Sequence, residues 1–207
     1  MRVLVTGGAG YVGSHSAKLL AETGHDVLIV DSLAEGHRPS VGNLPLVIAD
    51  LMDREGIAAV LKEHEIEAVM HFAAFAYVGV SVREPATYYQ NNIVGSLALL
   101  DAMREAGVNR IVFSSSCATY GIPQRVPITE DHPQNPISPY GFTKFVIERA
   151  LADYSHAYGL GYAALRYFNA SGAAADIRAD ARECYPTRRL PSFKMILFHR
   201  RKQRKQS

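Results

Sequence analysis

Residues 2–15 read RVLVTGGAGYVGSH and decide the fold of this 207-residue chain. The stretch opens with a mostly apolar run of the length of a buried strand, and glycines follow at once at positions 7, 10 and 13. From Tyr11 the apolar residues recur with the period of an α-helix for about three turns. A strand, a glycine turn and a helix in that order are the first unit of an α/β sheet.

The same alternation continues along the chain as far as about residue 170. Further strands are predicted over 26–31, 46–50, 67–72, 110–116 and 161–169, and further helices within 54–64, 85–106 and 138–159. Strands that are buried on both faces and joined by helices predict a doubly wound parallel sheet, a Rossmann-like α/β fold. The periodic pattern ends after Ala175. We therefore expect one domain over 1–175 and an irregular basic tail over 176–207.

The composition is that of a packed soluble domain, with 48% apolar residues, 20% charged residues and a mean hydropathy of −0.03. The sequence has no run of about 18 apolar residues, and the glycines interrupt the first apolar stretch before it reaches the length of a signal peptide. Its two cysteines, Cys117 and Cys184, lack the spacing of a disulfide framework or a zinc site. These features predict a cytoplasmic protein with no metal and no membrane partner.

The net charge of +2 conceals an uneven distribution. Residues 188–207 contain eight of the 22 Lys and Arg side chains and no acid, so residues 1–187 hold 14 basic against 20 acidic side chains. A nucleic-acid-binding face would spread its basic residues over a folded surface with aromatic residues among them. A single terminal basic run does not predict a nucleic-acid partner.

The spacing Gly7-x-x-Gly10-x-x-Gly13, between a strand and a helix, is typical of a dinucleotide-binding loop. The turn needs residues without a Cβ atom, and the backbone must approach the pyrophosphate closely. The start of the helix, at Tyr11 and Val12, offers N–H groups and a partial positive charge to the phosphates. The alternative is that the glycines only form a tight turn.

Asp31 ends the second strand, 18 residues after Gly13, near the separation expected for the acid that binds the adenosine ribose. A carboxylate there repels a 2′-phosphate, and neither Ser32 nor Leu33 supplies an arginine to offset the repulsion. The sequence therefore favours NAD over NADP. The alternative is that Asp31 only caps a loop.

Tyr140 and Lys144 lie four residues apart on a predicted helix, so both side chains project from one face. A phenol is a weak base at neutral pH, but a nearby Lys cation and the positive nicotinamide favour its ionised form. The strand before them ends in Ser114, Ser115 and Ser116, whose hydroxyls could bind the same substrate oxygen. Together with the glycine loop, this combination predicts an acid–base pair beside a nicotinamide.

With these residues the sequence resembles the extended short-chain dehydrogenase/reductase family, and within it the UDP-glucose 4-epimerases. The resemblance covers residues 1 to about 173 almost continuously. The segments that carry it are VTGGAGYVGSH, IADLMD, HFAAFAYVGVSV, YYQNNIVGSLALLDAM, FSSSCATYG, SPYGFTKFVIE and LRYFNASGA.

The resemblance implies a role for each matching residue. Tyr140 would be the catalytic base, Lys144 its electrostatic partner, and Ser116 the hydroxyl that orients oxygen 4 of the sugar. Three residues would bind the substrate: Ser116 and Tyr140 at the sugar, and Asn169 at the phosphates of the nucleotide sugar. The residues that match the family's NAD-binding pattern are Gly7, Gly10, Tyr11, Val12, Gly13, Asp31, Ser32, Asp50, Leu51, Phe72, Ala73, Ala74, Asn91, Tyr140, Lys144 and Phe168.

The implied activity is the interconversion of UDP-glucose and UDP-galactose through a 4-keto intermediate, with transient hydride transfer to NAD. A dehydratase would need an acid and a base just after the serine strand. Cys117 and Ala118 stand there instead, which disfavours that reaction. Epimerases and reductases of other nucleotide sugars remain alternatives, as does a non-catalytic NAD-binding or dimerising fragment.

The resemblance also implies a second domain and a second subunit. Family members continue into a smaller domain that holds the uridine, and residues 176–207 do not resemble it, so we expect a chain truncated or frame-shifted after about residue 175. We expect a homodimer that pairs the helices over 85–106 and about 140–158, as in resembling proteins. The candidate contacts are Tyr88, Leu97, Phe145 and Tyr154, and the alternative for each is a place in the core of its own domain.

Overall fold

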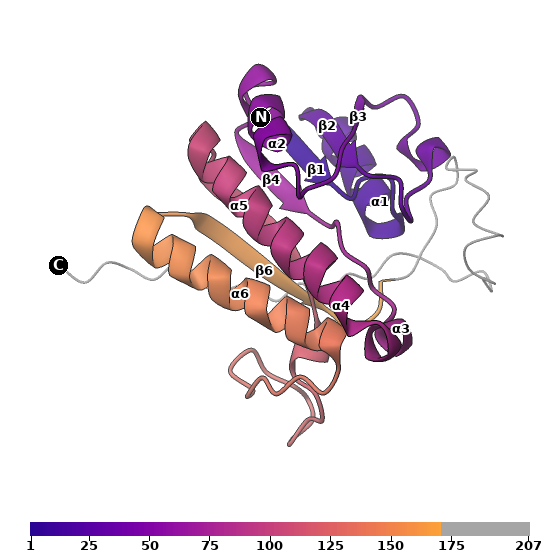
Figure 1. Cartoon of the computed structure of the whole chain (residues 1–207), viewed down its shortest axis with the longest axis vertical. Coiled ribbons are helices and arrows are strands. Elements are labelled where there is room, and N and C mark those ends of the chain that lie inside the picture. Colours follow the sequence, from indigo (N-terminus) through magenta and orange to yellow (C-terminus); the bar gives the residue numbers. More distant parts are fainter. Residues whose placement is uncertain (171–207) are drawn as a thin grey trace.

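A computed structural model describes residues 1–170, which form a parallel six-stranded sheet with helices on both faces (Figure 1). The sheet order is β3-β2-β1-β4-β5-β6. Its strands are β1 Arg2–Thr6, β2 Asp26–Asp31, β3 Leu46–Ile48, β4 Ala68–His71, β5 Arg110–Ser116 and β6 Gly161–Tyr167. The helices are α1 Tyr11–Glu22, α2 Arg54–Glu63, α3 Val78–Arg83, α4 Pro85–Tyr88, α5 Gly95–Ala106 and α6 Pro139–Tyr158, with shorter 3-10 turns η1 Arg38–Val41 and η3 Cys117–Thr119. The predicted α/β sheet is confirmed.

Two apolar cores lie on opposite faces of the sheet. Helices α2, α5 and α6 cover one face, where Leu4, Val69 and Phe113 of three neighbouring strands are almost completely buried. Helix α1 covers the other face over Val5 and Ile29. Because alternate residues of β1 enter different cores, the strand is buried on both sides, which explains why its sequence is nearly continuous in apolar residues.

The order of the strands places a topological switch point between β1 and β4. The chain runs outward from β1 to β3 and then returns to lay β4 on the other side of β1. Thr6 pairs with His71, and Phe72 N–H donates to Thr6 O at 2.9 Å. The loops that follow β1 and β4 therefore leave the same edge of the sheet side by side. This is where open α/β sheets bind their ligands.

Some predicted boundaries are wrong. The strands predicted to end at 50, 72 and 169 end at Ile48, His71 and Tyr167. The predicted single helix over 85–106 is interrupted between α4 and α5 by a π-helical segment, η2 Tyr89–Val94. Such segments often accompany functional sites. Here it carries Asn92, whose buried side chain is bonded outside the helix.

The candidate dimer contacts are only partly compatible with the structure. Tyr88 is 2% exposed and its hydroxyl donates to Tyr77 O at 2.8 Å, so it belongs to the interior of this chain. Leu97 and Tyr154 are half-buried against the core beneath α5 and α6, and Phe145 is half-buried as well. The predicted boundary at 175 and the tail over 176–207 lie outside the described residues. Within residues 1–170, no helix has the length and apolarity needed to cross a membrane.

Candidate functional site

The glycine loop after β1 is built from close backbone contacts. Gly7 has a φ of +70°, and a Cβ atom there would lie 2.4 Å from Ala73 N in the loop after β4. A Cβ atom on Gly13 would lie 2.1 Å from Gly7 O. By contrast, a Cβ on Gly10 would meet only Gly7 O, at 3.3 Å. The close backbone contacts of the loop therefore require Gly7 and Gly13, whereas at Gly10 the missing side chain leaves the loop surface open to a ligand.

The start of α1 is suited to an anion. Gly10 is the N-cap of this helix, no side chain caps it, and its first turn holds no acidic residue. The first N–H groups of a helix have no partner within the helix and carry a partial positive charge. Tyr11 is exposed and Val12 half-exposed on this turn. The loop and helix start thus fit the pyrophosphate of a dinucleotide.

Asp31 connects the glycine loop to the loop after β2. One carboxylate oxygen accepts Ala9 N–H at 2.9 Å and the other accepts Leu33 N–H at 2.8 Å. The side chain is 8% exposed, and a Cβ on Gly36 would come within 2.6 Å of it. Each oxygen retains acceptor capacity, so the loop-holding role and the ribose-binding role are compatible. The neighbouring Ser32 is exposed, and its hydroxyl accepts Ala34 N–H at 3.4 Å.

The next predicted cofactor residues follow β3 and β4 at the same edge of the sheet. Asp50 is exposed, and its carboxylate accepts Met52 N–H at 2.9 Å, while Leu51 packs half-buried on the core. Residues 72–74, which match the family's NAD-binding pattern, are half-buried directly after β4. Asn91 is also half-buried, and its side chain donates to Asn92 Oδ1 at 2.9 Å.

Asn92 is a residue that the sequence analysis missed. Its side chain is fully buried, accepts Phe75 N–H at 2.9 Å and donates to Phe75 O at 3.0 Å. It also donates to Thr143 Oγ1 at 3.2 Å, and Thr143 in turn donates to Tyr140 O at 2.7 Å. The π-helical segment thus joins the loop after β4 to the helix that carries the predicted acid–base pair.

Ser116, Tyr140 and Lys144 meet where β5 ends and α6 begins. Ser138 caps α6 by accepting Gly141 N–H, which fixes the start of the helix. Ser116 Oγ accepts Ala118 N–H at 3.1 Å, and a hydrogen bond joins its side chain to Tyr140. Lys144 Nζ lies 5.8 Å from the centroid of the Tyr140 ring. The structure therefore brings the predicted base, its cation and the orienting hydroxyl together.

Lys144 is the most unusual cation of the site. It is 2% exposed, donates to Ser114 O at 2.9 Å and stacks over the Phe113 ring at 4.9 Å. Burial lowers the pKa of Lys144 to about 7, and the negative charge of Glu148 opposes that shift. Its ammonium and neutral forms are thus close to balance at neutral pH.

The pKa of Tyr140 in the protein without cofactor is dominated by burial. Burial raises the pKa of Tyr140, and the hydrogen bond with Ser116 only partly offsets that effect. Lys144, itself near balance between charged and neutral, does not reverse the shift within the protein alone. The phenol therefore needs additional positive charge in the site to ionise.

Two predicted residues stand apart from this cluster. Phe168 is 42% exposed just after β6, and Asn169 is exposed beside it. They lie at the same edge of the sheet as Ser116, because Ser116 pairs with Tyr167 in the parallel ladder. The structure thus places both at the rim of the site, beside the end of the strand that carries Ser116.

Three comparisons with known proteins bear on this geometry. Residues 3–193 match the family described as the NAD dependent epimerase/dehydratase family. A UDP-glucose 4-epimerase from Lactobacillus helveticus is 50% identical over 177 residues, which are 85% of this chain and 54% of the relative. One from Rhizobium leguminosarum bv. trifolii is 50% identical over 171 residues, or 83% of this chain and 52% of the relative. The chain spans about half the length of these curated relatives.

Solved structures of UDP-glucose 4-epimerases are also similar to this chain. The UDP-glucose 4-epimerase from Brucella ovis in complex with NAD has 52% identity and a TM-score of 0.83, covering 84% of this chain and 54% of that one. The enzyme from Stenotrophomonas maltophila, with bound NAD and formylated UDP-arabinopyranose, has 46% identity and a TM-score of 0.82, covering 84% and 55%. The similarity thus extends over nearly all the described residues.

Proposed function

Because this chain belongs to the NAD dependent epimerase/dehydratase family, we propose that it carries the cofactor-binding and acid–base part of a UDP-glucose 4-epimerase. The observation that supports this most directly is the meeting of Ser116, Tyr140 and Lys144 at the edge of the sheet that also bears the glycine loop. The identity of about half of all aligned residues with UDP-glucose 4-epimerases supports the same substrate class.

The residues present fit NAD. The glycine loop and the start of α1 would receive the pyrophosphate, and Asp31 would accept the adenosine ribose hydroxyls. Asp50 and Leu51 would border the adenine, and residues 72–74 with Asn91 would line the path to the nicotinamide. When bound, NAD supplies a carrier that takes hydride from the sugar and returns it.

The acid–base chemistry is assigned to the residues of β5 and α6. Tyr140 takes the proton of the sugar 4-hydroxyl and returns it at the end of the cycle, while Ser116 hydrogen-bonds the same oxygen. Lys144 provides a nearby cation that favours the phenolate. Asn169 and Phe168 stand at the rim, where Asn169 would bind the nucleotide phosphates. Beyond Ser116 the chain has Cys117 rather than a carboxylic acid, which disfavours dehydration.

The cofactor assignment is tested by calorimetry with NAD and NADP. We expect NAD to bind more tightly, because the buried carboxylate of Asp31 meets a 2′-phosphate as a like charge. Asp31→Ala should weaken NAD binding and narrow the difference between the two cofactors. Equal affinity of the unmutated chain for NAD and NADP would contradict the role given to Asp31.

Catalysis is tested by a coupled assay for interconversion of UDP-glucose and UDP-galactose, with Tyr140→Phe as the blank. The second candidate is an NAD-binding chain without turnover. Positioning of the reacting groups can supply about 7 to 11 kcal/mol of barrier lowering. Turnover that Tyr140→Phe abolishes supports the enzyme; NAD binding without turnover supports the second candidate.

We further propose one NAD-binding domain over 1–175, a cytoplasmic location and a homodimer. The free thiol of Cys117 fits a reducing compartment. For the dimer, Leu97 on α5 with Phe145 and Tyr154 on α6 remain candidate contacts, because each is only half-buried. Light scattering at micromolar concentration tests the assembly, and a monomer there would reject it.

A further inference from the structure

Helix α6 carries a third polar side chain, Glu148, on the same face as the acid–base pair. Tyr140, Lys144 and Glu148 follow one another at intervals of four residues, so they form one stripe along the helix. The stripe faces the end of β5, where residues 114–116 are three consecutive serines. The sequence analysis identified the first two members of the stripe and missed Glu148.

Each serine of β5 contacts the stripe. Beside the bond between Ser116 and Tyr140, Ser114 O accepts from Lys144 Nζ, and Ser115 Oγ donates to Glu148 Oε1 at 2.5 Å. Glu148 is thus the last of three successive ties between the strand and the helix. Together these ties set the position of α6 along β5.

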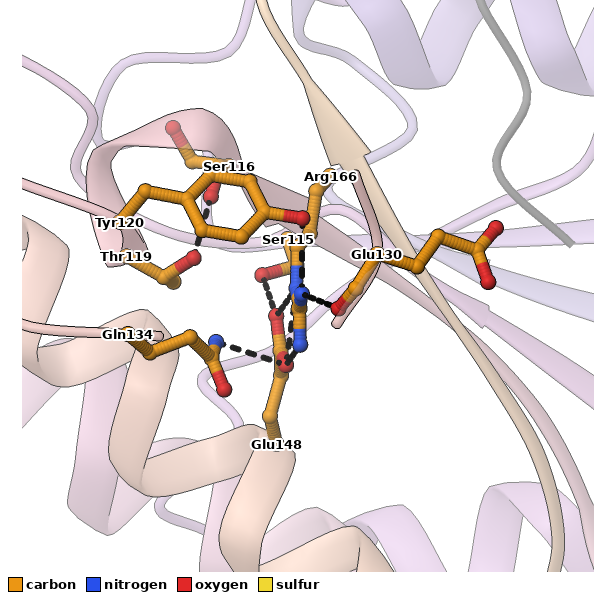
Figure 2. A network of polar contacts seen from close by, with 8 residues as sticks. All are labelled: Ser115, Ser116, Thr119, Tyr120, Glu130, Gln134, Glu148 and Arg166. Atoms are coloured by element: carbon orange, nitrogen blue, oxygen red, sulfur yellow. Dashed lines mark hydrogen bonds and ion pairs between the residues drawn. The ribbon is translucent and has the colours of Figure 1, made fainter. Parts of the chain in front are cut away.

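Arg166 of β6 clamps the Glu148 carboxylate (Figure 2). Its Nε lies 3.0 and 3.1 Å from the two carboxylate oxygens, and Nη2 lies 2.6 Å from Oε2. Nη1 donates to the Tyr120 hydroxyl at 2.8 Å, and the guanidinium stacks over the Tyr120 ring at 4.9 Å. Gln134 Nε2 also donates to Glu148 Oε2, at 3.1 Å. The carboxylate has one fixed orientation.

The pair is shielded from solvent. The side chains of Arg166 and Glu148 are 18% and 9% exposed. The clamp raises the pKa of Arg166, although burial acts in the opposite direction. The Glu148 carboxylate is therefore shielded and fully bonded, and one helical turn separates it from Lys144.

The groups around Lys144 show which charges act on its ammonium. From β4, His71 faces it, and burial together with the charge of Lys144 lowers the pKa of His71 to about 3, so His71 is neutral. From β5 it meets the Phe113 ring and Ser114 O, and from its own helix the Tyr140 ring. Among these groups of the described chain, Glu148 is the negative charge that acts on Lys144.

We propose that Glu148, clamped by Arg166, is a positioning residue that favours the cationic form of Lys144 and holds α6 in register with the serines of β5. The proposal deepens the proposed function and rests on its assignment of Tyr140 and Lys144 as the acid–base pair. Without the carboxylate, Lys144 loses its proton more readily, and the phenol of Tyr140 loses the cation that favours its ionisation.

The test is the titration of Lys144, followed by NMR of lysine labelled with ¹³C at Cε and assigned with Lys144→Met. In the unmutated chain we expect a midpoint of about 7. Glu148→Gln should lower it by about one pKa unit, the shift typical of a removed neighbouring charge. Glu148→Asp keeps the charge and should restore much of the difference. A merely structural ion pair would not move this midpoint.

Two controls keep the result interpretable. Asp153→Asn removes an acid from an exposed ion pair with Arg149 on the same helix and should leave the Lys144 midpoint unchanged. Glu148→Gln leaves Arg166 without its partner, which is costly in a shielded site, so Glu148→Gln with Arg166→Gln removes both charges and provides a folded alternative. Because the double variant also removes the positive charge of Arg166 beside the carboxylate, we expect it to lower the midpoint less than Glu148→Gln alone.

A folded Glu148 variant in which Lys144 titrates as in the unmutated chain would overturn the proposal. The titration is recorded without added cofactor, so it does not depend on the proposed function. Calorimetry with NAD on the same samples tests that function separately. Failure of the unmutated chain to bind NAD would therefore refute the cofactor assignment and leave the result on Glu148 standing.

Discussion

Replacing His71 with Gln should make the stability of the protein less sensitive to acid between pH 7.5 and 5. His71 ends β4 at 1% exposure, with Nδ1 at 2.7 Å from Thr6 Oγ1 and Nε2 at 2.8 Å from Ser96 Oγ. Ser96 Oγ in turn donates to Asn92 O. The ring is thus buried and bonded on both nitrogens in its neutral form, next to the Lys144 charge.

The magnitude follows from the displaced pKa. Burial, with the charge of Lys144, lowers the pKa of His71 from 6.5 to about 3 in the folded protein. The folded state therefore stays neutral while the unfolded state takes up a proton below pH 6.5, so the free energy of unfolding falls as the pH falls. The slope is about 1.4 kcal/mol per pH unit, which gives a loss of about 2 kcal/mol at pH 5.

The assay is urea unfolding followed by circular dichroism at several pH values, in the unmutated chain, His71→Gln and His64→Gln. His64 is exposed at the end of α2, so its replacement should leave the pH dependence as it is. His71→Gln should be less stable at pH 7.5 but lose about 2 kcal/mol less than the unmutated chain on going to pH 5. Parallel pH profiles for the unmutated chain and His71→Gln would refute the reasoning.

Three further outcomes are expected. Gly13→Ala should destabilise the fold by about 1–3 kcal/mol, because the added Cβ would lie 2.1 Å from Gly7 O. Gly79→Ala on α3 is the control, since a Cβ there would meet no atom within 4 Å. Equal melting temperatures of the two variants would contradict this expectation. Asn92→Ala should cost about 1–3 kcal/mol for each buried group left unbonded, and an unchanged urea midpoint would count against the role of Asn92. Burial raises the pKa of the Cys117 thiol from its ordinary value of 9.0. The rate of its alkylation by iodoacetamide, followed by mass spectrometry, should therefore keep increasing above pH 9. A rate that reaches a plateau near neutral pH would be the contrary result.

The sequence predicts the parts of the molecule that depend on local pattern. The boundaries of β5 and the glycine loop follow from apolar runs and from glycine spacing, and the structure has them as predicted. The pairing of Tyr140 with Lys144 follows from helical periodicity alone. These features need no knowledge of what lies beside them in space.

Other features depend on contacts between distant segments. The π-helical segment places Asn92 in hydrogen bonds with Phe75 and Thr143, which are 17 and 51 residues away in the sequence. The pairing of Glu148 with Arg166 requires the register of β6 against β5. One signal was available for Glu148, since it continues the four-residue spacing of Tyr140 and Lys144. A periodic pattern alone cannot tell a charged residue on a solvated face from one that is clamped.

The order of the strands also decides when each part of the site can form on the ribosome. The glycine loop needs only β1, β2 and β4, although β1 and β4 pair across 65 residues. Beyond β4, strands β5 and β6 follow one another in the sheet in the order in which they are synthesised. During synthesis the segments of the phosphate loop are therefore all available once β4 has emerged, whereas the contact of Glu148 on α6 with Arg166 has to await β6.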